Sequence, residues 1–81
     1  MKVNVQLFAR ARDLAGAGRL ELDVPAPARV AELKRSLAAK CPRVVPLLPN
    51  LLVAVGTDYA DDGTALSPDV EVACFPPVSG G

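Results

Sequence analysis

Apolar and polar residues alternate in two segments near the start of the chain. Residues 2–7 place an apolar side chain at every second position, and residues 19–24 repeat the pattern. A period of two residues is typical of a strand with one buried face. Both segments are therefore predicted to be strands that pair as a hairpin. Between them, residues 10–15 predict one or two helical turns that end at Gly16.

The next segment has the period of a helix. Val30, Leu33 and Leu37 fall on one face when the residues are placed at helical spacing. This pattern predicts a helix over residues 29–40. No Ser, Thr, Asp or Asn stands at the expected N-cap, so the helix start is predicted to depend on Pro27 or to fray.

The second half of the chain predicts further strands. Residues 51–55 are a continuous apolar run, which favours a central strand buried on both faces. Residues 47–49 are interpreted as a proline-bounded connector and residues 61–63 as a turn. Residues 70–75 have the pattern of a last strand.

This order of elements predicts an α+β roll, with a mixed sheet of four to five strands and one main helix packed on one face. In the β-grasp version of such a roll the first and last strands are parallel neighbours, a pairing that the sequence alone does not determine. With 81 residues the chain is long enough for one domain. We expect residues 1–75 to form that domain and residues 76–81 to be a flexible C-terminal tail.

The aromatic residues predict an exposed patch. In the last strand Glu71 should face solvent, and Phe75 shares its side of the strand. Phe8 falls in the register of the polar residues of the first strand. If the two strands are neighbours, both rings lie together on the outward face as a candidate docking patch, with Tyr59 as a third member. The alternative is that both phenylalanine rings fold over the edge of the core.

Composition excludes several functions. Net charge is zero without a basic run, so nucleic-acid binding has no electrostatic support. The chain has no histidine, which removes the commonest general base and metal ligand; no metal site is predicted. No segment resembles a signal peptide or a membrane span, so a cytoplasmic location without membrane contact is expected. In that compartment thiols stay reduced, so Cys41 and Cys74 are expected to be small buried hydrophobic residues without a disulfide.

The tail is the candidate reactive group. Pro76 and Pro77 lack backbone N–H groups, so strand pairing must end there, and the four following residues reach about 13 Å when extended. Gly80 and Gly81 leave space for walls to close around the backbone and for a nucleophile to approach. The Gly81 carboxylate, with a pKa of roughly 3.5, is ionised at neutral pH and must first be activated, and an acyl-adenylate is the expected form. The alternative is that the two glycines are only a frayed end.

No nucleotide site is predicted in this chain. Residues 16–18, Gly-Ala-Gly, lack the Gly-Lys-Ser/Thr ending of a phosphate-binding loop. The nucleotide that activates the tail must therefore be bound by a partner. This chain is expected to bind no cofactor and to be non-catalytic on its own.

With these features the chain resembles the MoaD-type small subunit of molybdopterin synthase, a ubiquitin-like β-grasp sulfur carrier. The resemblance rests on FPPVSGG at residues 75–81, LFARARDLAG at 7–16, LVAV at 52–55 and DVEVA at 69–73. Gly56 and Ser79 depart from the commoner Asn and Thr, and neither departure affects the tail chemistry.

The resemblance implies a reaction and partners. A MoeB-type enzyme would adenylate Gly81 with ATP, a sulfur donor would convert it to a thiocarboxylate, and a MoaE-type large subunit would accept the tail. The sulfur would then build the dithiolene of molybdopterin within a heterotetramer. The predicted partner-binding residues are Phe8, Tyr59, Phe75, Pro76, Pro77, Val78 and Ser79.

Three rival functions are considered. The first is a sulfur carrier for another pathway, of the thiamine, tRNA thiolation or cysteine type. The second is a protein modifier whose Gly81 forms an isopeptide bond with lysine. The third is a binding module with an inert tail.

Overall fold

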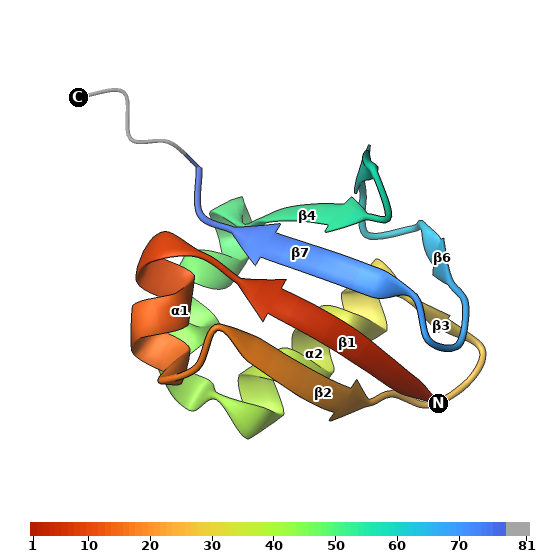
Figure 1. Cartoon of the computed structure of the whole chain (residues 1–81), viewed down its shortest axis with the longest axis horizontal. Helices are drawn as coiled ribbons and strands as arrows, with labels where there is room; N and C mark the ends of the chain where they lie inside the picture. Colours follow the sequence, from red (N-terminus) through yellow and green to blue (C-terminus); the bar gives the residue numbers. More distant parts are fainter. Residues whose placement is uncertain (78–81) are drawn as a thin grey trace.

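The computed structural model describes residues 1–77, and residues 78–81 lie outside its described part. Its main feature is a five-stranded mixed sheet (Figure 1). In spatial order the strands are β2 (Arg19–Asp23), β1 (Lys2–Leu7), β7 (Glu71–Phe75), β4 (Leu52–Val55) and β5 (Asp58–Ala60).

The first and last strands are parallel neighbours in the middle of the sheet. β1 and β7 pair from Asn4↔Glu71 to Leu7↔Cys74, and β1 also pairs with β2 in antiparallel register. On the other side β4 pairs antiparallel with β7 and with β5. This is the predicted β-grasp roll.

A short helix, α1 (Ala9–Ala15), connects β1 to β2 as predicted. It ends at Gly16, whose φ of 77° is left-handed and whose N–H donates to the Arg12 carbonyl. This conformation suits glycine because a Cβ would be strained there. The chain then returns along β1, so the predicted hairpin pairing is correct.

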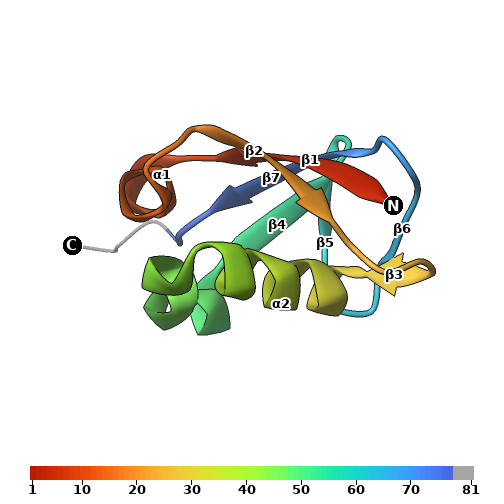
Figure 2. The same ribbon diagram turned by 90° about the horizontal axis from the view of Figure 1, so that it is seen from below.

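The main helix, α2 (Val30–Lys40), covers one face of the sheet together with the 3₁₀ helix η1 (Pro42–Asn50) (Figure 2). Val30, Leu33 and Leu37 are the buried residues of α2, which confirms the predicted apolar stripe. They pack with the inward side chains of the strands. Burying these side chains is the main source of the fold's stability. None of the helices over residues 1–77 is long and apolar enough to cross a membrane.

The start of α2 differs from the prediction. The N–H of Val30 donates to the Thr64 carbonyl (3.0 Å) and that of Ala31 to the Asp62 carbonyl (3.1 Å). The N–H of Arg29 donates to the Glu32 carboxylate (3.1 Å). A two-stranded sheet of β3 (Ala28–Arg29) and β6 (Ala65–Leu66) holds the loop there. The helix therefore does not fray: loop carbonyls and the Glu32 carboxylate accept the N–H groups at its start, without a hydrogen bond from an N-cap side chain.

Two other predictions need correction. Residues 47–49 are not a plain connector, because they belong to η1. The run at 51–55 is not a central strand buried on both faces: β7 is the middle strand, and β4 lies between β7 and β5. Val53 is 2% exposed, whereas its neighbour Leu52 is 38% exposed. The reason is that helices cover only one face of the sheet.

Candidate functional site

Three aromatic rings meet on the uncovered face of the sheet. The ring centroid of Phe75 lies 6.1 Å from that of Phe8 and 5.8 Å from that of Tyr59. The interplanar angles are 71° and 75°, so both contacts are edge-to-face. This geometry is the favourable one for aromatic pairs. All aromatic residues of the chain thus gather at one place.

The backbone brings these rings together from three parts of the chain. The N–H of Phe8 donates to the Cys74 carbonyl (3.2 Å), which extends the pairing of β1 with β7 by one residue. Tyr59 on β5 lies opposite Ala54 on β4. Leu52 on β4 lies opposite Phe75 on β7. Since paired residues share a face of a sheet, all four large side chains point outward.

These four side chains, Phe8, Leu52, Tyr59 and Phe75, form what we call the docking patch. Phe8 is 45% exposed and Tyr59 72%, while Phe75 is half-buried between them. The structure therefore confirms the outward placement predicted for Phe8 and Phe75. The two rings do not fold over the edge of the core, which was the alternative.

Leu52 was not predicted as part of this patch. Its place in an apolar run suggested burial, yet it lies beside Phe75 on the open face. The register of β4 against β7 would have revealed it, but that pairing joins residues far apart in sequence. An exposed leucine next to three aromatic rings makes the patch larger and more apolar.

The other half of the same face is ionic. Arg19 on β2 reaches Glu71 on β7 at 2.6 Å, and Lys2 on β1 pairs with Glu21 on β2 at 3.4 Å. These side chains are exposed, so the pairs add little to stability. The outward face is thus divided between an ionic half over β2 and β1 and an apolar half over β4, β5 and the end of β7.

The docking patch lies where the tail begins. Phe75 is the last residue of β7, and Pro76 and Pro77 follow it without regular secondary structure. Pro76 is half-buried and Pro77 exposed. Val78, Ser79, Gly80 and Gly81, which the sequence analysis assigned to partner binding and chemistry, lie outside the described residues.

The thiol of Cys74 is unsuited to chemistry in the folded protein. It points into the core and is 1% exposed. Burial raises the pKa of Cys74 from its usual 9.0 to about 12, against a smaller opposing effect of Lys34. The thiol is therefore protonated and shielded at neutral pH, and thiolate is the reactive form. Cys41 and Cys74 do not form a disulfide.

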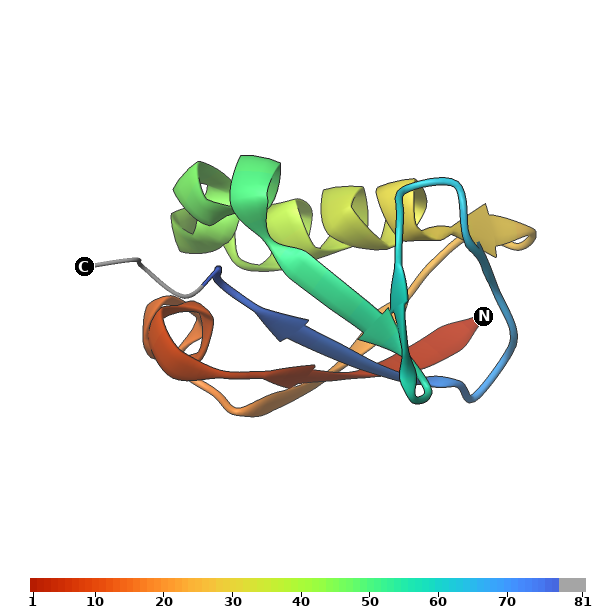
Figure 3. The same ribbon diagram turned by 90° about the horizontal axis from the view of Figure 1, so that it is seen from above.

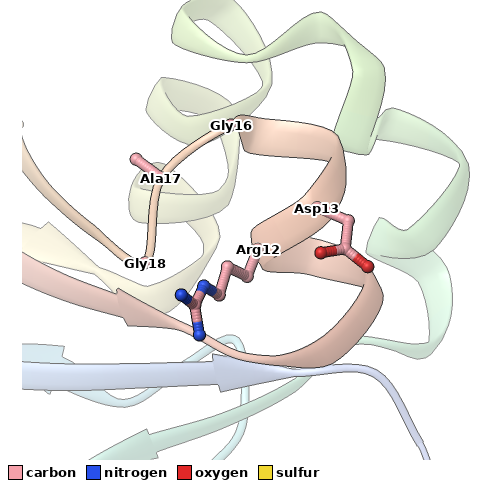
Figure 4. Close-up of a pocket in the computed structure, with 5 residues that line it drawn as sticks. All are labelled: Arg12, Asp13, Gly16, Ala17 and Gly18. Atoms are coloured by element: carbon pink, nitrogen blue, oxygen red, sulfur yellow. The ribbon is translucent and has the colours of Figure 1, made fainter.

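No other feature of residues 1–77 forms a side-chain site. These residues contain no group of three or more His, Cys, Asp or Glu that could hold a metal ion. An open pocket of about 450 Å³ lies where α1 turns into β2, lined by Arg12, Asp13 and residues 16–18. In Figure 4 Arg12 extends towards Gly18, while Asp13 points the other way. The pocket is open and its lining is mainly polar, with no large apolar side chain, so it lacks the features of a substrate site.

Known proteins with similar sequences are sulfur carriers. Residues 5–81 match the ThiS family. The chain is 31% identical over 81 residues to the molybdopterin synthase sulfur carrier subunit of Arabidopsis thaliana, covering all of this chain and 84% of that protein.

Similar solved structures cover nearly the whole chain. The small archaeal modifier protein SAMP1 of Haloferax volcanii has a TM-score of 0.89 at 27% identity, with complete coverage of both chains. A putative molybdopterin converting factor subunit 1 from Pyrococcus furiosus has a TM-score of 0.86 at 29% identity, over 96% of this chain and 99% of that one.

A more distant structure shares the fold alone. It is a chain in the complex of subunits 1 and 2 of molybdopterin-converting factor from Helicobacter pylori. Its TM-score is 0.70 at 21% identity, with complete coverage of both chains.

Proposed function

Because the chain belongs to the ThiS family, we propose that it is the sulfur carrier subunit of a molybdopterin synthase. The observation that carries this proposal is the match along its whole length to a protein named for that role. The docking patch at the base of the tail supports it, because a carrier must bind a partner and present its tail to that partner.

The reacting group in this proposal is the carboxylate of Gly81. A MoeB-type enzyme joins a carboxylate oxygen to the α-phosphorus of ATP, and pyrophosphate leaves. A sulfur nucleophile then attacks the carbonyl carbon of the adenylate and AMP leaves, which gives a thiocarboxylate. Gly80 supports this chemistry because it has no side chain to obstruct the approach.

The structure supports a tail reagent over a side-chain reagent. Cys74 is buried with its pKa raised to about 12, which makes it a poor sulfur carrier. The described residues contain no histidine and no metal-binding group that could act as catalyst. In this proposal the protein is non-catalytic alone and draws on ATP held by its activating partner.

The proposed acceptor is a MoaE-type large subunit, which would bind the docking patch and take the tail into its active site. Phe8, Tyr59 and Phe75 would supply apolar contact area, and Leu52 would add to it. Pro76 and Pro77 have fixed φ angles, so they would direct Val78 and Ser79 into the partner at low entropic cost. We propose a heterotetramer with the large subunits at its centre.

Intact mass spectrometry tests the proposal. The protein is incubated with a MoeB-type enzyme, ATP and hydrosulfide. Exchange of one oxygen for sulfur should raise its mass by about 16 Da. A variant that lacks Gly81, and a second with one residue added after it, should gain no mass and keep their circular dichroism spectra. An unchanged mass for the natural chain would sink the proposal.

A protein modifier is the second candidate, and the fold similarity to SAMP1 favours it. In that role the activated Gly81 would form an isopeptide bond with a lysine of another protein. Cells that produce the tagged chain would then contain conjugates that survive denaturation and reducing agent. A thiocarboxylate without such conjugates would leave the sulfur carrier as the function.

A further inference from the structure

Positive charge is concentrated at the end of the molecule from which the tail leaves. α1 and η1 flank the end of β7 (Figure 3), and α1 contacts both of these elements. Arg10 and Arg12 lie on α1, Lys40 is the last residue of α2, and Arg43 lies in the first turn of η1. We call these four residues the cationic rim.

The rim is not neutralised by the rest of the described chain. Within residues 1–77 none of its four cations takes part in an ion pair. All four residues are exposed. Lys40 makes one hydrogen bond, to the backbone carbonyl of Glu21. α1 and η1 carry a single carboxylate, Asp13, which is next to Arg12 in sequence. On α2 the one carboxylate is Glu32, which lies in the first turn, at the other end of the helix from Lys40, and pairs with Arg35.

Carboxylates are concentrated at the opposite end. Asp58 begins β5, Asp61 and Asp62 lie in the turn before β6, and Asp69 donates its N–H to the carbonyl of Lys2. Of these, only Asp62 is in an ion pair within the described residues. A chain of zero net charge is therefore a dipole, with its positive end at the base of the tail.

We propose that the cationic rim steers the chain, tail end first, onto an acidic surface around the entrance of the adenylating partner's active site. Steering of this kind raises association rates by about ten- to a thousandfold and is screened by salt. It also orients the encounter, because the dipole repels approach by the opposite end. The apolar docking patch would then provide short-range affinity.

This inference rests on the proposed function only in requiring that a partner takes up the tail. It holds equally for a sulfur carrier and for a modifier, since both are activated first. It also distinguishes the rim from the aromatic docking patch: rim substitutions should change the association rate more than the dissociation rate.

Stopped-flow association with a MoeB-type enzyme tests the rim. We expect Arg10→Glu and Arg43→Glu each to lower the association rate constant about threefold at about 0.1 M salt, and the double variant about tenfold. Arg29→Glu is the matched control, because Arg29 is exposed, without an ion pair among residues 1–77, and lies at the other end of α2. Its rate should change less than about twofold.

The salt dependence of the association rate distinguishes electrostatic steering from a direct contact made by the rim residues. Between about 0.1 M and 1 M salt the Debye length falls from about 10 Å to about 3 Å. The differences between the natural chain and the rim variants should disappear over this range. Equal effects of Arg10→Glu and Arg29→Glu, or unchanged rates in the double variant, would overturn the inference.

The mass assay shows whether a failure lies in this inference or in the proposed function. With long incubation the double rim variant should reach the same thiocarboxylate yield as the natural chain, only more slowly. If the double variant gains mass as fast as the natural chain, the rim does not steer while the carrier function stands. If neither gains mass, the carrier function fails, and the association rates still decide whether the rim steers.

Discussion

The two faces of the central strands differ in what covers them and in what they do. On β7, Val72 and Cys74 point inward and are 1% exposed, while Ala73 and Phe75, which alternate with them, are only partly covered. Helices cover the inner face, and no helix of residues 1–77 covers the outer one (Figures 2 and 3). The difference teaches that alternate residues of one strand can serve separate purposes: those on the inner face build the core, and those on the outer face are free for the partner binding that we propose.

A change on the inner face should have the largest effect. Leu33→Ala removes a fully buried side chain beneath the sheet. Its free energy of unfolding should fall by about 2–5 kcal/mol, from the lost burial and the cavity left behind. Urea denaturation measures this. Tyr59→Ala on the outer face should lower stability by less than about 0.5 kcal/mol; similar losses for both variants would contradict the division.

A charge on the outer face should impair binding and spare the fold. Phe75→Asp places a carboxylate in the centre of the docking patch. The dissociation constant for a MoaE-type large subunit should rise about thirtyfold or more, which corresponds to about 2 kcal/mol. Calorimetric titration measures it.

The control for Phe75→Asp is Gln6→Asp, on the ionic half of the same face. It should leave the dissociation constant within about twofold. If Phe75→Asp instead unfolds the domain, Phe75 belongs to the core and the comparison of faces fails at that residue.

Alkaline pH should affect the inner face through Cys74. The unfolded thiol ionises near 9.0 and the folded one at about 12, so the folded state holds its proton more tightly. This contribution is complete below pH 9 and is lost as pH rises from 9 to 12. The fall in stability over that range should be smaller in Cys74→Ala than in the natural chain. Equal slopes in the natural chain and in Cys74→Ala would argue against a buried thiol.

The smallest effect is expected at the start of α2, away from both faces. Glu32→Ala removes the carboxylate that accepts the N–H of Arg29. Stability should fall by about 1 kcal/mol, the usual value of a helix cap. Glu32→Gln keeps an acceptor and should lose less than half of that amount. Equal losses for the two would show that the hydrogen bond is not the cause.

Local patterns predicted most of the fold. The period of two in residues 2–7 and 19–24 and the stripe of Val30, Leu33 and Leu37 correspond to β1, β2 and α2. The β-grasp arrangement and the family resemblance are likewise confirmed. Local signals were sufficient here because each element buries one clearly apolar face.

What the sequence did not reveal depends on distant contacts. Two of the N–H groups at the start of α2 are bonded by the backbone carbonyls of Asp62 and Thr64, which carry no side-chain signal. Leu52 is exposed only because β4 pairs with β7 on an uncovered face. The helix η1 was hidden by its prolines, although Val44 buries its side chain in the core.

The docking patch was predictable in part. The positions of Phe8 and Phe75 followed from register once the two strands were neighbours, whereas Tyr59 was placed by the pairing of β5 with β4. The roles of Val78, Ser79, Gly80 and Gly81 stay predictions, as do the boundary between domain and tail at residue 75 and the cytoplasmic location.

The most direct test of the account is to locate the sulfur after activation. The natural chain is treated with a MoeB-type enzyme, ATP and hydrosulfide, and its C-terminal peptide is fragmented in a mass spectrometer. We predict a gain of about 16 Da confined to Gly81, the mark of a thiocarboxylate. A C-terminal peptide of unchanged mass, or a gain of about 16 Da on a side-chain carboxylate instead of Gly81, would contradict the claim that the tail is the reagent.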